Sequence, residues 1–156
     1  RLRFAKVHGP ALDVPDDHVD VVISFLSFRY LDWDPVMAEI RRVLVPGGRL
    51  WVVDMVEKPA RLRELPVLLR SGAAHLRTRR TRPQFTEDLA ALTSHPDWLN
   101  MLQHNPIRAE HEYRWYFGSR FPGSRLETLT ATMSARVVAF DSGPLEKGQT
   151  APLSYP

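Results

Sequence analysis

The chain has 156 residues, of which 44% are apolar and 25% are charged, a composition typical of an ordinary globular domain rather than of a disordered chain. It contains no cysteine, which excludes disulfide frameworks, thiolate zinc sites and a cysteine nucleophile. No apolar run reaches the roughly 18 residues of a membrane helix, and the first residues lack the apolar core of a signal peptide. We therefore expect a cytoplasmic protein without a membrane span.

The net charge of +3 is unevenly distributed along the chain. Residues 58–82 carry eight basic side chains against one acidic residue, Glu64, whereas residues 1–57 are slightly acidic. Such a basic cluster can bind nucleic acid, anionic lipid or an anionic substrate. Aromatic residues do not interleave with it, as binding to single-stranded nucleic acid would require. A solvated helix face is the simpler interpretation, and we do not expect nucleic acid as a partner.

Apolar and β-branched runs predict three strands in the first part of the chain, at residues 2–7, 19–28 and 49–55. The run at 19–28 is nearly continuous, which is typical of a strand buried on both faces. A helical pattern at 35–44 follows Asp34, a suitable N-cap, and Pro46-Gly47-Gly48 should end that helix. Strand, helix and strand in this order predict a crossover unit of an α/β sheet.

The second part of the chain is predicted to be helical first and stranded later. Leucines line one side of a helix over 59–77, where Pro66 and Gly72 should kink or break it. After it we expect a loop over 78–84, a helix over 85–92 capped by Thr86, and a short helix within 94–106. The rest of the chain is predicted to form a strand over 110–117, a turn at 121–125, one or two strands within 126–140 and a loose tail over 141–156.

Four blocks follow one another in the order found in a known family. They are Val14-Pro15, Val19-Asp20-Val21-Val22, the run EIRRVLVPGG from Glu39 to Gly48, and the apolar strand Leu50–Val53. Together they resemble class I S-adenosylmethionine-dependent methyltransferases, most closely the small-molecule enzymes of the ubiquinone and menaquinone biosynthesis type. The clear resemblance covers roughly residues 2–56, and the third block is its most specific element.

The resemblance implies an α/β fold, the Rossmann-like seven-stranded methyltransferase sheet, here without its first strands and its glycine-rich loop. Residues 1–140 would be an incomplete methyltransferase domain. Its parts would be cofactor-side strands and a helix at 1–56, lid or substrate helices at 57–109 and terminal strands at 110–140, with the loose tail at 141–156. A fragment of a longer gene product is the interpretation we favour; a partner chain that completes the sheet, or a rearranged sheet, are the alternatives, because the strand at 19–28 would otherwise have an open edge.

The resemblance also implies the cofactor, S-adenosylmethionine, and a small-molecule methyl acceptor. The loop of Gly9, Pro10, Ala11 and Leu12 would run alongside the adenine ring of the cofactor. Ser24, Phe25 and Leu26 would lie under the methionine part of the cofactor. Substrate contacts would come from Phe28, Arg29, Tyr30, Asp54 and Glu57. One departure concerns Pro10, which stands where many members have an acidic residue that accepts from the adenine amino group.

No catalytic residue and no metal site can be assigned from the sequence. His75, His104 and His111 are candidate bases, although a lone histidine is more often a surface residue, and no H-x-x-x-H pattern indicates a metal. Tyr113, Trp115 and Tyr116 could line a substrate pocket or simply pack on the sheet. We expect Glu39, Arg41 and Arg42 to be structural.

Four functions remain open at this point. The first is methyl transfer to a small molecule by the full-length protein, with this span alone inactive. The second is a non-catalytic methyltransferase-like interaction domain, which Pro10 and the missing glycine loop favour. The third is an RNA-directed methyltransferase, suggested by residues 58–82. An NAD-binding half is weaker, because Pro-Gly-Gly before a strand is not a dinucleotide fingerprint.

Overall fold

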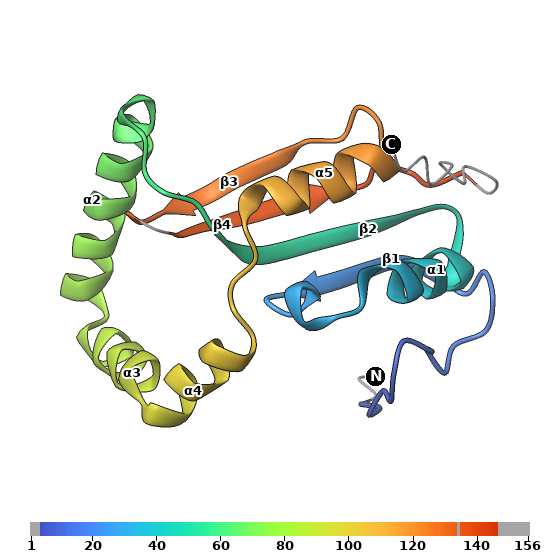
Figure 1. Ribbon diagram of the computed structural model, residues 1–156, viewed down its shortest axis with the longest axis horizontal. Coiled ribbons are helices and arrows are strands. Elements are labelled where there is room, and N and C mark those ends of the chain that lie inside the picture. The colour runs from blue at the N-terminus through green and yellow to red at the C-terminus, as the bar shows by residue number, and fades with distance from the viewer. Residues whose placement is uncertain (1–3, 134, 147–156) are drawn as a thin grey trace. The chain divides into compact units, whose positions relative to one another are not determined.

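The computed structural model describes residues 4–133 and 135–146 (Figure 1). The described residues form two compact units: those within 1–54, 113–127 and 139–146 make the first unit, and those within 55–112 and 128–138 make the second. In chain order the elements are β1 (Val19–Phe25), the 3-10 turn η1 (Phe28–Tyr30), α1 (Trp33–Val43), β2 (Leu44–Glu57), η2 (Leu62–Glu64), α2 (Leu65–Thr81), α3 (Pro83–Ser94), α4 (Pro96–His104), α5 (Glu110–Arg120), β3 (Leu126–Ala131) and β4 (Ala135–Asp141).

The strands form one mixed sheet in the order β1-β2-β4-β3. β1 pairs with β2 in parallel, with Val22 opposite Leu50 and Phe25 opposite Val53, and α1 connects the two strands. The predicted α/β class and its strand-helix-strand unit are therefore confirmed. Within the described residues β1 is an edge strand of this sheet.

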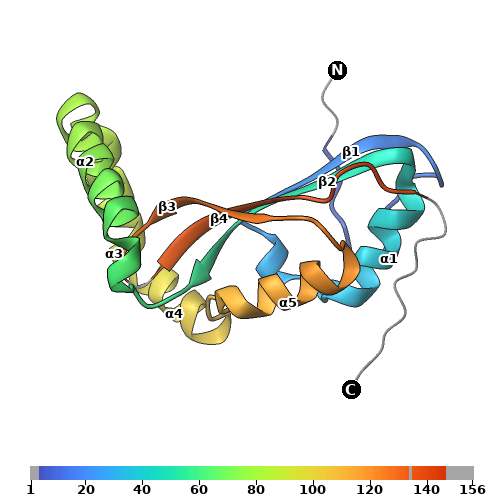
Figure 2. The ribbon, with the colours of Figure 1, turned by 90° about the horizontal axis from the view of Figure 1, so that it is seen from above.

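One face of the sheet carries the core of the first unit. α1 and the part of α5 from Tyr113 onward lie on the same side of β1 and β2 (Figure 2). Alternate residues of β2, among them Leu50 and Val52, point to this side and are buried, as the two-residue period of a strand requires. The rings of Phe117 and Phe140 stack there with centroids 4.0 Å apart. The other buried apolar side chains of this layer include Met37, Ile40, Val43, Tyr113, Tyr116 and Phe121.

The opposite face of β1 and β2 is open, which differs from the predicted burial on both faces. Ile23 is 62% exposed, Phe25 67% and Trp51 41%. The apolar run of β1 therefore has one covered side, to which Val22 and Ser24 point, and one apolar side that faces solvent. A continuous apolar run shows that both sides of a strand could be buried, but it does not show what covers each side.

Two predicted boundaries around α1 were wrong. The N-cap is Asp32 rather than Asp34, which lies in the first turn. The helix ends at Val43, before the Pro-Gly-Gly segment, and that segment lies within β2 as a bulge that shifts the strand register. Gly47 has φ 82°, a backbone conformation that a glycine adopts without steric cost. The glycines therefore permit the bulge instead of terminating the helix.

The helices of the second unit also differ from expectation. α2 begins later than the predicted helix, has Pro66 in its first turn, where proline is tolerated, and continues through Gly72 to Thr81. Most of the predicted loop at 78–84 is therefore helical. α3 begins at Pro83 with Arg82 as N-cap, so Thr86 is not a cap. The predicted short helix is α4, at Pro96–His104.

A buried charge network lies in the second unit beside these helices. The Arg136 side chain is 1% exposed, and its Nη2 donates to Oε2 of Glu64 at 2.9 Å. The other oxygen of Glu64 accepts from Lys58 at 3.0 Å, and Lys58 also lies 2.6 Å from Glu110. Hydrogen bonds from Lys58, Arg136 and the Arg61 backbone lower the pKa of Glu64 to about 2.

The predicted strand at 110–117 is wrong, because these residues belong to α5. Tyr113, Tyr116 and Phe117 are all buried, and their i, i+3 and i+4 spacing is that of one helix face. One or two strands were predicted within 126–140, and the structure has two, β3 and β4.

The two ends of the described chain differ from the predicted strand and tail. Phe4 to Val7 form no strand, and residues 2 and 3 of the predicted strand lie outside the described residues. Of the predicted loose tail, residues 147–156 also lie outside them. Leu145 packs on the sheet instead, since it is 8% exposed and its backbone N–H donates to the Gly48 carbonyl at 2.9 Å.

Candidate functional site

Parallel α/β sheets bind ligands beyond the carboxyl ends of their strands. The parallel pairing of β1 with β2 ends at Phe25 and Val53 in the first unit, while β2 itself continues to Glu57 in the second. β1 leads into a turn in which the hydroxyls of Ser24 and Ser27 lie 3.0 Å apart. Leu26 in this turn has φ 52°, a left-handed conformation that costs a non-glycine residue about 1–2 kcal/mol. Its backbone N–H donates to the Val53 carbonyl at 2.7 Å, which ties the strained turn to β2.

A buried ion pair connects this turn to the end of β2. The backbone N–H of Arg29 donates to Oδ2 of Asp54 at 2.9 Å, and its Nη1 donates to Oδ1 at 3.3 Å. The two side chains are 3% and 0% exposed. Removal of either partner would leave a charge without its counterion in a dry environment, so the pair fixes η1 on the strand end.

Two tyrosines extend the ion pair in opposite directions. The hydroxyl of Tyr113, on α5, donates to Oδ2 of Asp54 at 2.8 Å. Nη2 of Arg29 donates to the hydroxyl oxygen of Tyr30 at 2.6 Å, and the Tyr30 residue is 42% exposed. The four side chains form one hydrogen-bonded chain from the core of the first unit to its surface. We call it the Asp54 network, made of Tyr113, Asp54, Arg29 and Tyr30.

Aromatic rings pack beneath this network. Phe28 is fully buried, and its carbonyl accepts from Trp33 Nε1 at 3.0 Å. The Phe28 and Trp33 rings stack with centroids 5.6 Å apart, and Tyr113 meets the Trp33 ring edge-on at 5.0 Å. Burial raises the pKa of the neighbouring Tyr116 well above its ordinary value. This aromatic floor makes the position of η1 rigid.

The loop before β1 is held by α1. Glu39 accepts from the Leu12 backbone N–H at 3.0 Å, and Arg42 donates to the Leu12 carbonyl at 3.0 Å and to the Val14 carbonyl at 2.9 Å. Arg42 also pairs with Asp16 at 2.6 Å and with Glu39 at 2.8 Å. Hydrogen bonds from Arg42 and Leu12 lower the pKa of Glu39 to about 2. Glu39 and Arg42 are thus structural, as the sequence predicted, and so is Arg41, which donates to the Arg120 carbonyl at 3.5 Å.

The structure brings only some of the predicted site residues together. Ser24, Phe25, Leu26, Phe28, Arg29, Tyr30 and Asp54 cluster at the strand ends, while Gly9, Pro10, Ala11 and Leu12 belong to the loop before β1. Glu57 is exposed in the second unit, where its N–H donates to the Arg108 carbonyl at 2.9 Å. His75, His104 and His111 are exposed residues of that unit. Among the described residues, no group of three histidine, aspartate or glutamate side chains could hold a metal ion.

Sequence reasoning placed Ser27, within the segment 24–29, at the end of a strand, but it did not connect Tyr113 and Trp33 to the strand ends. Tyr113 and Tyr116 are core residues, whereas Trp115 is 59% exposed, so the three do not line one pocket. The helical spacing of the buried aromatics in α5 was the signal that could have located Tyr113. Nothing in the sequence indicates its bond to Asp54, 59 positions away.

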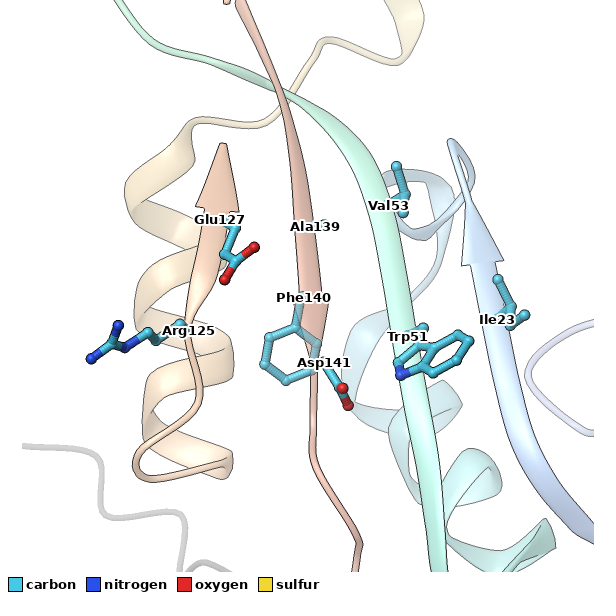
Figure 3. Close-up of a pocket in the computed structure, with 8 residues that line it drawn as sticks. All are labelled: Ile23, Trp51, Val53, Arg125, Glu127, Ala139, Phe140 and Asp141. Atoms are coloured by element: carbon cyan, nitrogen blue, oxygen red, sulfur yellow. The ribbon is translucent and has the colours of Figure 1, made fainter. Parts of the chain in front are cut away.

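A separate hollow of about 450 Å³ lies on the open face of the sheet (Figure 3). Its lining consists of Ile23, Trp51, Val53, Arg125, Glu127, Ala139, Phe140 and Asp141. The floor is apolar and aromatic, and Asp141 on the rim pairs with Arg49 at 3.0 Å. The lining residues come from all four strands and, with Arg125, from the segment directly before β3, and no sequence pattern had suggested them as a group.

With this geometry in place, the chain can be compared with known proteins. Residues 2–52 match the family model described as "Methyltransferase domain". This part of the chain is therefore similar to a methyltransferase domain, in agreement with the resemblance seen in the sequence. A demethylmenaquinone methyltransferase of Thermus thermophilus is 37% identical over 59 residues, which are 37% of this chain and 27% of the relative.

Solved structures are also similar to parts of the chain. A SAM-dependent methyltransferase from Aquifex aeolicus is 15% identical, with a TM-score of 0.47 over 89% of this chain and 54% of the other. The [4+2]-cyclase SpnF is 25% identical, with a TM-score of 0.39 over 88% of this chain and 55% of the other. The chain therefore spans about half the length of these structures. No helix of the described residues is long and apolar enough to cross a membrane.

Proposed function

We propose that the whole protein carrying this sequence transfers a methyl group from S-adenosylmethionine to a small-molecule acceptor at the carboxyl ends of β1 and β2. The family match at residues 2–52 supports the reaction class. The Asp54 network is the observation that carries the location, because it fixes an exposed turn at the edge where such sheets bind ligands.

The residues at the strand ends fit the polar methionine end of this cofactor. The left-handed Leu26 and the paired hydroxyls of Ser24 and Ser27 gather backbone and hydroxyl groups that can bind a carboxylate and an ammonium group. Gly9, with φ 74° and no atom within 4 Å of a built Cβ, leaves the loop before β1 open to a flat ring. We assign the adenine side to residues 9–12 and the methionine side to residues 24–26.

Burial changes the part that the other predicted substrate contacts can play. Phe28 and Asp54 are 0% exposed and Arg29 is 7% exposed, so they would act by holding the site in shape. Tyr30 is the member of the network that reaches solvent, and we propose it as the contact with the acceptor. A guanidinium can only donate, so the Tyr30 oxygen accepts the hydrogen bond from Arg29. The hydroxyl proton of Tyr30 therefore does not point at Arg29.

The bound cofactor supplies a sulfonium methyl group that is open to in-line displacement by a nucleophilic oxygen, nitrogen or carbon. The protein's task is then mainly alignment, because a nucleophile held in line gains most of the rate by proximity. A rigid η1 on an aromatic floor suits that task. The Thermus relative is named for demethylmenaquinone, so a reduced naphthoquinone is the first acceptor to test here.

The test is transfer of radiolabelled methyl from S-adenosylmethionine to 1,4-naphthohydroquinone by the whole gene product. We expect turnover that falls at least roughly tenfold in Arg29→Met, since the turn loses its buried anchor. A control variant, Arg49→Met, removes an exposed guanidinium of the same unit and should retain the rate. Cofactor binding without transfer to any of a panel of small phenols, amines and quinols would favour the non-catalytic interaction domain instead.

A further inference from the structure

The helices of the second unit expose apolar side chains to an unusual degree. None of the described residues in α2, α3 or α4 is buried. On α2, Leu65 is 52% exposed, Leu69 65% and Leu76 56%. Their i, i+4 and i+11 spacing places the three leucines within an arc of about 40° on the helix. We call this row the leucine stripe of α2.

The stripe lies away from the hydrogen bond that joins α2 to β3. The Ser71 hydroxyl accepts from the Ala131 backbone N–H of β3 at 3.1 Å, and this position is about 140° around the helix from the centre of the stripe. Leu68 and Thr78, on the Ser71 side, are half-buried. The helix thus has one side that contacts β3 and an opposite side of exposed leucines, and it also contacts α3.

All the charged side chains of α2 are positive. The helix carries four arginines, Arg70, Arg77, Arg79 and Arg80, and no acidic residue. Among the described residues, none of the four guanidinium groups forms an ion pair with a carboxylate. Arg79 and Arg80 lie within about 60° of the stripe, close enough for their stems to lie along it.

An apolar stripe flanked by unpaired arginines fits a surface that is apolar inside and anionic outside. We propose that α2 docks on an anionic phospholipid surface, with the leucine stripe at the acyl boundary and the arginines at the phosphates. Burial of the leucines at the acyl boundary stabilises the bound helix. Each arginine near an anionic leaflet raises the binding constant by a factor of about five. The helix lies in the plane of such a surface and does not cross it.

Two other partners are less well matched to the same surface. RNA would use the arginines, but α2 has no phenylalanine, tyrosine or tryptophan on which bases could stack, and the leucines would stay in water. A second copy of this chain would cover the leucines, but it would bring two sets of unpaired arginines together, which opposes association.

The experiment is cosedimentation of the full chain with vesicles of phosphatidylcholine alone and with about 30% phosphatidylglycerol. We expect binding to the anionic vesicles that is at least roughly tenfold tighter than to the neutral ones. Arg77→Gln with Arg80→Gln should remove most of that preference, and Leu69→Gln with Leu76→Gln should weaken binding to anionic vesicles at least roughly tenfold. Matched controls in the first unit and in β3, Arg125→Gln and Leu129→Gln, should bind as the wild type does.

Three results would overturn the proposal. One is no binding to anionic vesicles at low salt while circular dichroism shows a folded chain. Another is a concentration-dependent dimer by light scattering that Leu69→Gln abolishes, without vesicle binding, because the stripe would then be an interface between copies. The third is binding of a fluorescent RNA oligonucleotide that needs the arginines but not the leucines, while vesicles bind equally in all variants.

Discussion

The hydroxyl of Tyr113 donates a 2.8 Å hydrogen bond to Oδ2 of Asp54, whose side chain is 0% exposed. This bond joins α5 to the end of β2 and supports the carboxylate that also binds Arg29. Tyr116, one turn further along α5, donates a similar bond at 3.1 Å to Asp34, whose side chain is 52% exposed. The two tyrosines are therefore a matched pair that differs in the burial of the carboxylate.

We predict different costs for removing these two hydroxyls. Tyr113→Phe leaves a buried carboxylate with one donor fewer and should lower the free energy of unfolding by about 1.5–3 kcal/mol. Tyr116→Phe should lower it by about 0.5 kcal/mol, because water can replace the lost donor at an exposed carboxylate. Urea unfolding followed by circular dichroism measures both. Equal costs would show that the Asp54 network does not stabilise the strand end.

The pH dependence of stability should report the bond between Glu39 and the loop before β1. Hydrogen bonds from Arg42 and the Leu12 backbone hold the pKa of Glu39 at about 2 in the folded chain, below its ordinary value of 4.5. The folded state therefore binds the proton less readily than the unfolded state, and the stabilisation is fully present above about pH 4.5 and lost as the pH falls toward 2. Glu39→Gln lacks this titration, so the difference in stability between wild type and variant should shrink across that range. A constant difference from pH 6 to pH 2.5 would contradict the assignment.

In the second unit, the buried guanidinium of Arg136 depends on Glu64. Glu64→Ala should lower the free energy of unfolding, because the guanidinium, 1% exposed, would lose its counterion. Replacing both residues, as Glu64→Ala with Arg136→Met, should recover most of that loss, since no buried charge remains. A double-mutant cycle by chemical denaturation measures the coupling, and additive costs would mean that the pair does not stabilise the unit.

Tyr30 provides a test of the acceptor side. Tyr30→Phe removes the oxygen that accepts from Arg29 Nη2, so it should lower the unfolding free energy by about 0.5–1.5 kcal/mol and leave the protein folded for the assay. If the hydroxyl binds the acceptor, the variant should raise the KM for the acceptor severalfold, with the affinity for S-adenosylmethionine unchanged. Unchanged KM in an active enzyme would exclude Tyr30 as an acceptor contact and leave the proposed reaction intact.

The α/β class and the parallel pair were predictable because apolar periodicity distinguishes strands from helices in β1, α1 and β2. α5 was not predicted, because the charges in EHEYRWYF imitate the alternation of a strand. Pro46-Gly47-Gly48 stands where a helix could end, and only the partner strand reveals that it forms a bulge. Local patterns thus identified the elements but not all of their boundaries.

The candidate site was predictable only in part, for a physical reason. A motif identifies residues near one another in sequence, such as those of η1, and these lie at the strand ends as the fold rule requires. The bond between Tyr113 and Asp54 joins distant parts of the chain, and the positive φ of Leu26 belongs to a residue with no intrinsic preference for it. Such features follow from tertiary packing alone.

The most direct test of the central claim is calorimetric titration of the whole gene product with S-adenosylmethionine, in the wild type and two variants of Leu26. Its φ of 52° is free of strain for glycine and a severe outlier for valine. We predict 1:1 binding by the wild type, an affinity within about threefold of it for Leu26→Gly, and an affinity at least about tenfold weaker for Leu26→Val. Absence of binding by the folded wild type, or equal affinities for glycine and valine at this position, would contradict a cofactor site on the turn after β1.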